Sequence, residues 1–310
     1  MARPKKTNTM SPFMETLKTK LLEKYSEGTV NLYLTKLRLL NRDKVFSSLT
    51  FLKDHVKINE IISKIDNANT RKSYLTALVG VLEQLNNPTY NKLNSNYKTA
   101  LNTFKTEVVN KIDPNVKTAT QEENWLEWDE VLEIQKKLQT EADKVTQEQI
   151  DNNNSHSINA LERNVLLSLY TGLPPRRNAD YFQMIIGKGD DKTKNHYDGE
   201  HFIFNIYKTA RARGPEKFSV PNSLRTVLDH YIKMMGLKSG DYLLFPEMTD
   251  RAGSVKMTRS LNSIFGKSVS SSMLRHIWNT HLLGPMLSKV KENAAALGHS
   301  VGTDLAYVKI

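Results

Sequence analysis

Apolar residues recur at helical spacing through the first third of the chain, and this pattern limits the fold more than any other feature. Four segments carry it: 11–25, 26–42, 69–85 and 97–112. Residues three or four positions apart share one face of an α-helix, so each segment predicts an amphipathic helix. Ser11 followed by Pro12 is a typical start for the first of them. Strand signals are nearly lacking here, so residues 10–112 predict a helical bundle.

The rest of the chain has a mixed pattern. Helical periodicity marks the segments 128–145, 157–173, 223–236, 258–268, 270–284 and 286–299. Residues 201–209 alternate apolar and polar side chains, and the segment KFSVP at 217–221 follows, which predicts a β-hairpin or two strands of a small sheet. A proline and a change from basic to acidic side chains mark 113–123 as a linker. We therefore expect a mainly α protein with a small antiparallel β-sheet in a C-terminal domain at 124–310.

Glycine and serine predict where several of these C-terminal helices begin and end. Gly236 and Gly298 each follow a helical segment, where a residue without a side chain can end the helix in a left-handed turn. The serines at 270–272 precede an apolar helical segment and can cap its first turn.

Positive charge is concentrated in the N-terminal part. Residues 1–120 hold 20 Lys and Arg against 10 Asp and Glu, whereas residues 121–310 hold 24 against 23. A basic region joined to a near-neutral one favours a protein that grips a polyanion, and we expect nucleic acid rather than a merely soluble basic surface. Residues 1–9, MARPKKTNT, form a short basic arm that we expect to be flexible.

Several function classes are excluded by what the sequence lacks. The chain has no cysteine, which rules out disulfides, Cys-ligated zinc and thiol catalysis. An apolar run of about 18 residues and a signal-peptide pattern are both missing, which argues against a membrane span or secretion. No acidic cluster suits two-metal catalysis, so we expect neither a metal nor another cofactor.

Cations and a tyrosine follow one another through the C-terminal region in a fixed order. The series is Arg176 and Arg177 in PPRRNADY, Lys208 in IYKTARARG, Arg275 in SMLRHIW, and His299 and Tyr307 in LGHSVGTDLAY. Taken singly, each feature is more often an ion pair, a solvated turn or a helix cap. The order Arg, Lys, Arg, His, Tyr is what indicates a function.

This order resembles the tyrosine recombinases, the lambda-integrase or phage-integrase family of DNA strand-exchange enzymes. The family's first box, an apolar helix followed by T-G-L-R and an acid, is similar to YTGLPPRRNAD. Its catalytic lysine lies on a β-hairpin, as in IYKTARARGPEKFSVP, and its second box, H-x-L-R-H, is similar to SMLRHIWNTHLLG. The ending LGHS with a later tyrosine is similar to LGHSVGTDLAY. The resemblance covers roughly residues 160–310, and residues 10–112 agree in class with the family's helical core-binding domain.

The resemblance implies a catalytic set. Tyr307 would attack a DNA phosphate and form a covalent 3′-phosphotyrosine, while Arg177 and Arg275 hold the phosphate oxygens. Lys208 would protonate the leaving oxygen, and His299 would donate to a phosphate oxygen. The planar, permanently charged guanidinium suits the first task, and the transferable proton of lysine suits the second. The phosphotyrosine retains the bond energy, so neither ATP nor a metal is required.

Three departures from the family pattern affect individual residues. Two prolines precede the arginines, so Arg176 is an alternative to Arg177. We favour Arg177 because Asp180 then has the family's spacing and would brace it. Ser272 stands where the family usually has His or Lys, and its role stays open. The tyrosine follows the LGHS histidine by one residue fewer than is usual, and three residues follow it.

Three functions agree with these residues. The first is a site-specific recombinase or integrase, similar to those of viruses and mobile elements. The family resemblance implies double-stranded DNA as its partner, bound by a dimer on inverted half-sites and by a tetramer in the synapse. The second is a DNA-relaxing enzyme like the type IB topoisomerases, and the third is a DNA-binding relative that has lost catalysis. In each case we expect the protein inside the cell at DNA, in the nucleus or virus factory of a eukaryotic host or the cytoplasm of a prokaryote. Further DNA contacts are expected from Arg211, Arg213 and His276.

Overall fold

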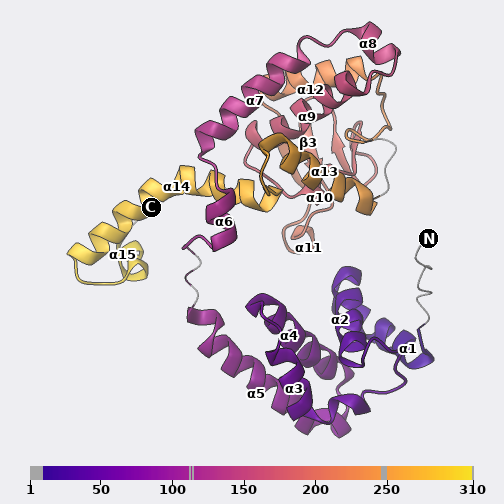
Figure 1. The fold of residues 1–310 in the computed structure, drawn as a ribbon, viewed down its shortest axis with the longest axis vertical. Coiled ribbons are helices and arrows are strands. Elements are labelled where there is room, and N and C mark those ends of the chain that lie inside the picture. The colour runs from indigo at the N-terminus through magenta and orange to yellow at the C-terminus, as the bar shows by residue number, and fades with distance from the viewer. Residues whose placement is uncertain (1–9, 112, 114, 246–249, 309–310) are drawn as a thin grey trace. The chain divides into compact units, whose positions relative to one another are not determined.

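A computed structural model describes residues 10–308 except 112, 114 and 246–249. The chain divides into an N-terminal unit, Met1–Val116, and a C-terminal unit, Lys117–Ile310 (Figure 1). The predicted basic arm at 1–9 lies outside the described residues. The predicted linker at 113–123 spans the boundary between the units, and α6 (Ala119–Asn124) begins within it.

The N-terminal unit is a helical bundle. Its helices are α1 (Pro12–Leu22), α2 (Glu27–Leu40), α3 (His55–Ser63), α4 (Ala68–Leu85) and α5 (Asn91–Glu107), with 3₁₀ turns η1 (Thr50–Leu52), η2 (Pro88–Tyr90) and η3 (Val109–Lys111). As predicted, Ser11 caps α1, because its hydroxyl accepts a hydrogen bond from the Met14 amide at 3.2 Å. Leu78 and Val81 of α4 are buried in the core, against α1, α2 and α5. The predicted helices are confirmed, and α3 lies in a stretch where none was predicted.

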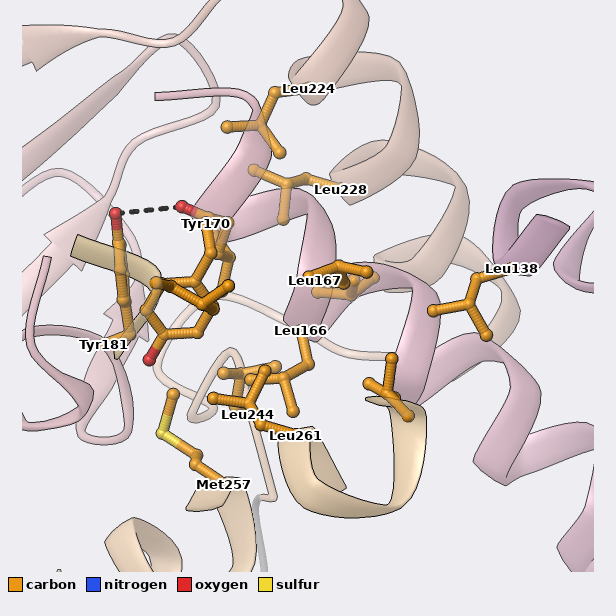
Figure 2. Packing of buried hydrophobic residues seen from close by; sticks show 14 of the residues in the cluster. Leu138, Leu166, Leu167, Tyr170, Tyr181, Leu224, Leu228, Leu244, Met257 and Leu261 are labelled. Carbon is orange, nitrogen blue, oxygen red and sulfur yellow. Dashed lines mark hydrogen bonds between the residues drawn. The ribbon is translucent and has the colours of Figure 1, made fainter. Parts of the chain in front are cut away.

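The C-terminal unit packs helices around one buried helix and a small sheet. The helices besides α6 are α7 (Trp128–Ala142), α8 (Gln147–Asp151), α9 (Ser155–Thr171), α10 (Asn178–Tyr181), α11 (Ala210–Arg213), α12 (Asn222–Met234), α13 (Asp250–Phe265), α14 (Ser271–Ala296) and α15 (Val301–Tyr307). Helix α9 is central, because Leu166, Leu167 and Tyr170 are all buried against residues of α7, α12 and α13 (Figure 2). The core therefore fixes the end of α9, from which the chain enters the first arginine motif.

The sheet is mixed, which corrects the prediction of an antiparallel one. Its strands, in spatial order, are β1 (Met184–Ile186), β2 (Asn195–Tyr197), β3 (His201–Phe204) and β4 (Glu216–Ser219). The predicted hairpin is confirmed, since β3 and β4 pair antiparallel with Phe204 opposite Glu216. The difference arises at β1, which pairs with β2 in the parallel direction. Both of these strands are three residues long, too short for their alternation to stand out in the sequence.

Helix α14 differs from the two helices predicted at 270–284 and 286–299. It runs without interruption from Ser271 to Ala296 and contains Pro285. The predicted serine cap is confirmed, because the Ser270 hydroxyl accepts from the Met273 amide at 3.3 Å. Gly298 ends the helix as predicted, with a φ of 73° and its amide donating to the Ala295 carbonyl.

Candidate active site

Arg177 stands at the start of α10, directly after the turn that follows α9. Its backbone is extended (φ −78°, ψ 153°), and its carbonyl accepts from the Asp180 amide at 2.9 Å. The next residue, Asn178, is buried and accepts from the Tyr170 hydroxyl at 2.6 Å. Its amide group also donates to the Thr258 hydroxyl at 3.0 Å. These bonds join α9, α10 and α13 beneath Arg177, so the backbone that carries this arginine is firmly placed.

Arg275 lies on the second turn of α14 and is half-buried. Its Nη2 donates to the Ser272 hydroxyl at 2.8 Å, and its Nε approaches the Ser271 carbonyl at 3.4 Å. Ser272 thus orients the arginine. The neighbouring His276 is exposed on the same helix.

Arg177 and Arg275 lie within each other's electrostatic field. Burial lowers the pKa of Arg275 and the charge of Arg177 lowers it further, while Asp180 and Tyr170 act in the opposite direction. Among the described residues, neither arginine forms an ion pair with a carboxylate. Two like charges so placed repel each other, and an anion bound near them would relieve this. The two arginines therefore form a candidate anion site.

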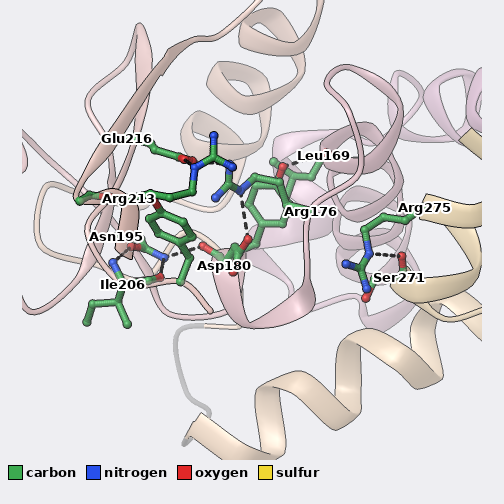
Figure 3. Close-up of polar contacts among 12 residues, drawn as sticks. Leu169, Arg176, Asp180, Asn195, Ile206, Arg213, Glu216, Ser271 and Arg275 are labelled. Atoms are coloured by element: carbon green, nitrogen blue, oxygen red, sulfur yellow. Dashed lines mark hydrogen bonds and ion pairs between the residues drawn. The ribbon is translucent and has the colours of Figure 1, made fainter. Parts of the chain in front are cut away.

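Asp180 pairs with Arg176, so the predicted brace for Arg177 is wrong. The Arg176 Nε lies 3.0 Å from Asp180 Oδ2, and its Nη1 lies 3.1 Å from Glu216 Oε2 (Figure 3). The guanidinium also lies 3.9 Å from the ring centroid of Phe204. Arg176 lies before α10 and Arg177 is extended at its start, so no helical spacing decides which arginine meets Asp180.

Lys208 and Arg211 lie exposed in the connection between β3 and β4. Arg213 lies there too and forms a 3.3 Å ion pair with Glu216. Partial burial raises the pKa of the Glu216 carboxyl, but the hydrogen bond from Arg176 and the charges of Arg176 and Arg213 outweigh it, so this pKa lies below its usual range. Lys208 therefore sits in a loop whose base is held by ion pairs.

His299 and Tyr307 are brought together at the C-terminal end of α14. Their ring centroids are 5.6 Å apart, and with Leu297 and Val308 they line a cavity of about 510 Å³. The Asn293 side chain donates to Asp304 at 2.8 Å and joins α14 to α15. Tyr307 is 71% exposed.

The structure does not place this pair beside the arginines. From Arg275 to Ala296 the chain is one helix, which at about 1.5 Å per residue amounts to roughly 31 Å. Helix α15 packs against the far part of α14 (Figure 1). His299 and Tyr307 therefore lie apart from Arg275 in this conformation.

Two residues of the site were missed by sequence reasoning. Glu216 was assigned to the segment that connects the two predicted strands, and Asn195 to a polar loop. Asn195 is buried, donates to the Asp180 and Ile206 carbonyls at 2.9 and 2.8 Å, and accepts from the Ile206 amide (Figure 3). Neither residue has a role in the quoted family pattern, and both bond residues more than ten positions away, so only the fold reveals them.

Comparison of the chain with protein-family models, curated proteins and solved structures finds no match in any of the three. Within the described part of the chain, no helix has both the length and the apolar character needed to cross a membrane.

Proposed function

We propose that this protein cleaves and rejoins DNA strands through a covalent bond to Tyr307, as a site-specific recombinase or integrase. The observation that supports this most is that the charge of Arg177 reaches Arg275, whose pKa is lowered first by burial and further by that charge. Two guanidinium groups from separate helices act on one another, and neither has a carboxylate ion pair among the described residues. A phosphodiester has the charge and the two free oxygens that such a pair would bind.

In the proposed reaction, the Tyr307 oxygen attacks phosphorus and the bond from phosphorus to the 5′-oxygen breaks. The tyrosine proton leaves to solvent or a nearby base, and Lys208 gives its proton to the departing 5′-oxygen. Arg177 and Arg275 would stabilise the added negative charge of the transition state, and a preorganised donor of this kind is worth about 2.7–4 kcal/mol. Attack by the 5′-hydroxyl of another strand then reverses the step and restores the tyrosine.

For this reaction Tyr307 must approach Arg275, and α14 has a place where it can bend. Pro285 has no amide hydrogen, so the helix lacks the bond to the His281 carbonyl, and Gly284 directly precedes it. Apolar side chains beyond and beside this point are exposed: Leu282 51%, Leu283 48%, Met286 63% and Leu297 59%. Full burial of such a side chain is worth about 1.5–3 kcal/mol, so folding the arm back would be favoured by each one it covers. We infer that the active form is bent near Pro285.

The N-terminal unit would supply most of the affinity for DNA. Residues 1–120, which include this unit, hold 20 basic against 10 acidic residues, and this excess would neutralise phosphates without reading sequence. Binding should therefore weaken steeply as salt rises. The logarithm of the binding constant should fall by about 0.9 per unit of log salt concentration for each phosphate neutralised.

The proposal is tested with a pool of DNA duplexes that carry a randomised central segment and a nick. A nick lets the short cleaved product diffuse away, so a covalent adduct accumulates. We expect the full chain to form an adduct that survives detergent, and Tyr307→Phe to bind the pool equally but form none. Sequencing the attached DNA then gives the site, and two matched sites on one plasmid distinguish recombination from relaxation of any supercoiled plasmid.

A DNA-binding protein without catalysis is the second candidate. The separation of Tyr307 from Arg275 along α14 favours it. This candidate predicts selection of a specific sequence from the pool by binding, with no adduct on that sequence. A topoisomerase-like enzyme would instead form adducts on many sequences and relax supercoils without a second site.

A further inference from the structure

Arg176 is engaged on three sides within the C-terminal unit. Its guanidinium bonds the buried Asp180 of α10 and Glu216 of β4, and it lies over Phe204, the last residue of β3. The guanidinium carbon of Arg176 also lies 5.2 Å from the ring centroid of Tyr207, the residue before Lys208. The exposed fractions of the side chains of Arg176, Asp180 and Glu216 are 20%, 4% and 18%, so these contacts are sheltered from water.

The loop that carries Lys208 is closed at the same point. The Tyr207 hydroxyl donates to the Gly214 carbonyl at 2.7 Å and joins the two ends of the loop. Asn195 forms a second bridge, because its amide group donates both to the Asp180 carbonyl and to the Ile206 carbonyl. The segment that begins with Arg177 and the loop with Lys208 are thus fixed to one another through both Arg176 and Asn195.

We propose that Arg176 is a positioning residue that sets Lys208 at a fixed place relative to Arg177, rather than a phosphate-binding residue. This inference rests on the proposed function, in which Lys208 protonates the 5′-oxygen. Two donors of Arg176 are already bonded to carboxylates, whereas Arg177 and Arg275 have no such ion pair among the described residues. Lysine could not replace it, because an ammonium group lacks the planar fork that bonds two carboxylates while stacking on a ring.

The test compares two DNA substrates that differ in one atom. Once the site is known, the 5′-oxygen of the scissile phosphate is replaced by sulfur, which leaves as a thiolate and needs no proton. Loss of a general acid costs about 10²–10⁴-fold in rate. We expect Lys208→Ala to show such a loss on the oxygen substrate and Arg176→Met to show at least about a tenfold loss, with both restored to near the wild-type rate on the sulfur substrate.

A milder variant and a matched control guard against misfolding. Glu216→Gln weakens only the contact between Arg176 and β4. Its cleavage rate should fall less than that of Arg176→Met on the oxygen substrate, and should return to near the wild-type rate on the sulfur substrate. Lys217→Gln is the control, because Lys217 lies beside Glu216 on β4 and pairs instead with Asp198 at 3.5 Å. It should keep the wild-type rate on both substrates.

Hydrogen exchange separates failure of this inference from failure of the proposed function. In the free protein, Arg176→Met should raise exchange at residues 205–215, and Lys217→Gln should not. An equal rate loss on oxygen and sulfur would overturn the inference and assign Arg176 to the phosphate, and unchanged exchange at 205–215 would overturn it as well. If the wild-type chain forms no adduct on either substrate, the proposed function fails, while the exchange result still decides whether Arg176 holds the loop.

Discussion

Replacing Pro285 by alanine should trap α14 in its straight form and slow DNA cleavage. Proline in a helix interior is about 3 kcal/mol less favourable than alanine. Pro285→Ala should therefore stabilise the straight helix over a bent one by about that amount. At 1.4 kcal/mol for each factor of ten, this is a shift of roughly 150-fold in the equilibrium between the two forms. If wild type is mostly straight, adduct formation should fall by as much as that factor.

The bend is measured as a distance between two labels. The chain has no cysteine, so cysteines introduced at the exposed Glu133 on α7 and Glu292 on α14 are the only attachment points. Spin labels on the wild-type background should show a shorter distance on DNA than in the free protein, and this shorter distance should be reduced or lost in Pro285→Ala.

Ser288→Ala is the matched control for this prediction. Ser288 is exposed on the same arm, and its replacement changes helix propensity by about 0.5 kcal/mol. It should leave both the distances and the rate nearly unchanged. If Pro285→Ala cleaves as fast as wild type and its label distances on DNA match those of wild type, the bend is not part of the reaction, and Tyr307 must reach Arg275 by another route, such as from a second copy of the chain.

Further predictions concern the arginine site, the loop and a helix cap. Arg275→Gln should lower the rate of adduct formation by about 10²–10³-fold and weaken DNA binding far less, measured by single-turnover kinetics and by titration. The pKa of the Glu216 carboxyl is lower in the folded protein than the value of about 4.3 expected in the unfolded chain. The ionised carboxylate therefore stabilises the fold fully above about pH 4.3, and this stabilisation is lost as pH falls through the folded-state pKa. Protection of residues 205–215 from hydrogen exchange, corrected for intrinsic rates, should therefore be flat from about pH 7 to 5 and fall below about 4; a fall already near pH 6 would contradict this. Ser270→Ala should destabilise the protein by about 1 kcal/mol in urea unfolding, because the Met273 amide loses its acceptor.

Local sequence signals predicted local structure well. Ser11 caps α1, and Gly236 and Gly298 end α12 and α14 in left-handed turns with φ of 63° and 73°. Each of these features depends on residues within four positions of one another. The β3–β4 hairpin could also be predicted, because both strands are close in sequence and alternate in character.

Features that depend on distant residues were not predictable. The parallel pairing of β1 with β2 is decided by how the chain between them folds, not by either strand's own residues. Arg176 meets Glu216 across 40 positions, and no spacing rule links them. At Gly284–Pro285 the local signal for a break was present, yet the helix continues through it, so local preference gave the wrong element there.

The most direct test of the central claim is to identify the amino acid that becomes attached to DNA. The adduct from the nicked duplexes is digested with a protease and a nuclease, and the modified peptide is sequenced by mass spectrometry. We predict a single nucleotide-bearing peptide, modified at Tyr307 and absent when that residue is phenylalanine. An adduct at another residue, or specific DNA binding with no adduct on the selected site, would contradict the account.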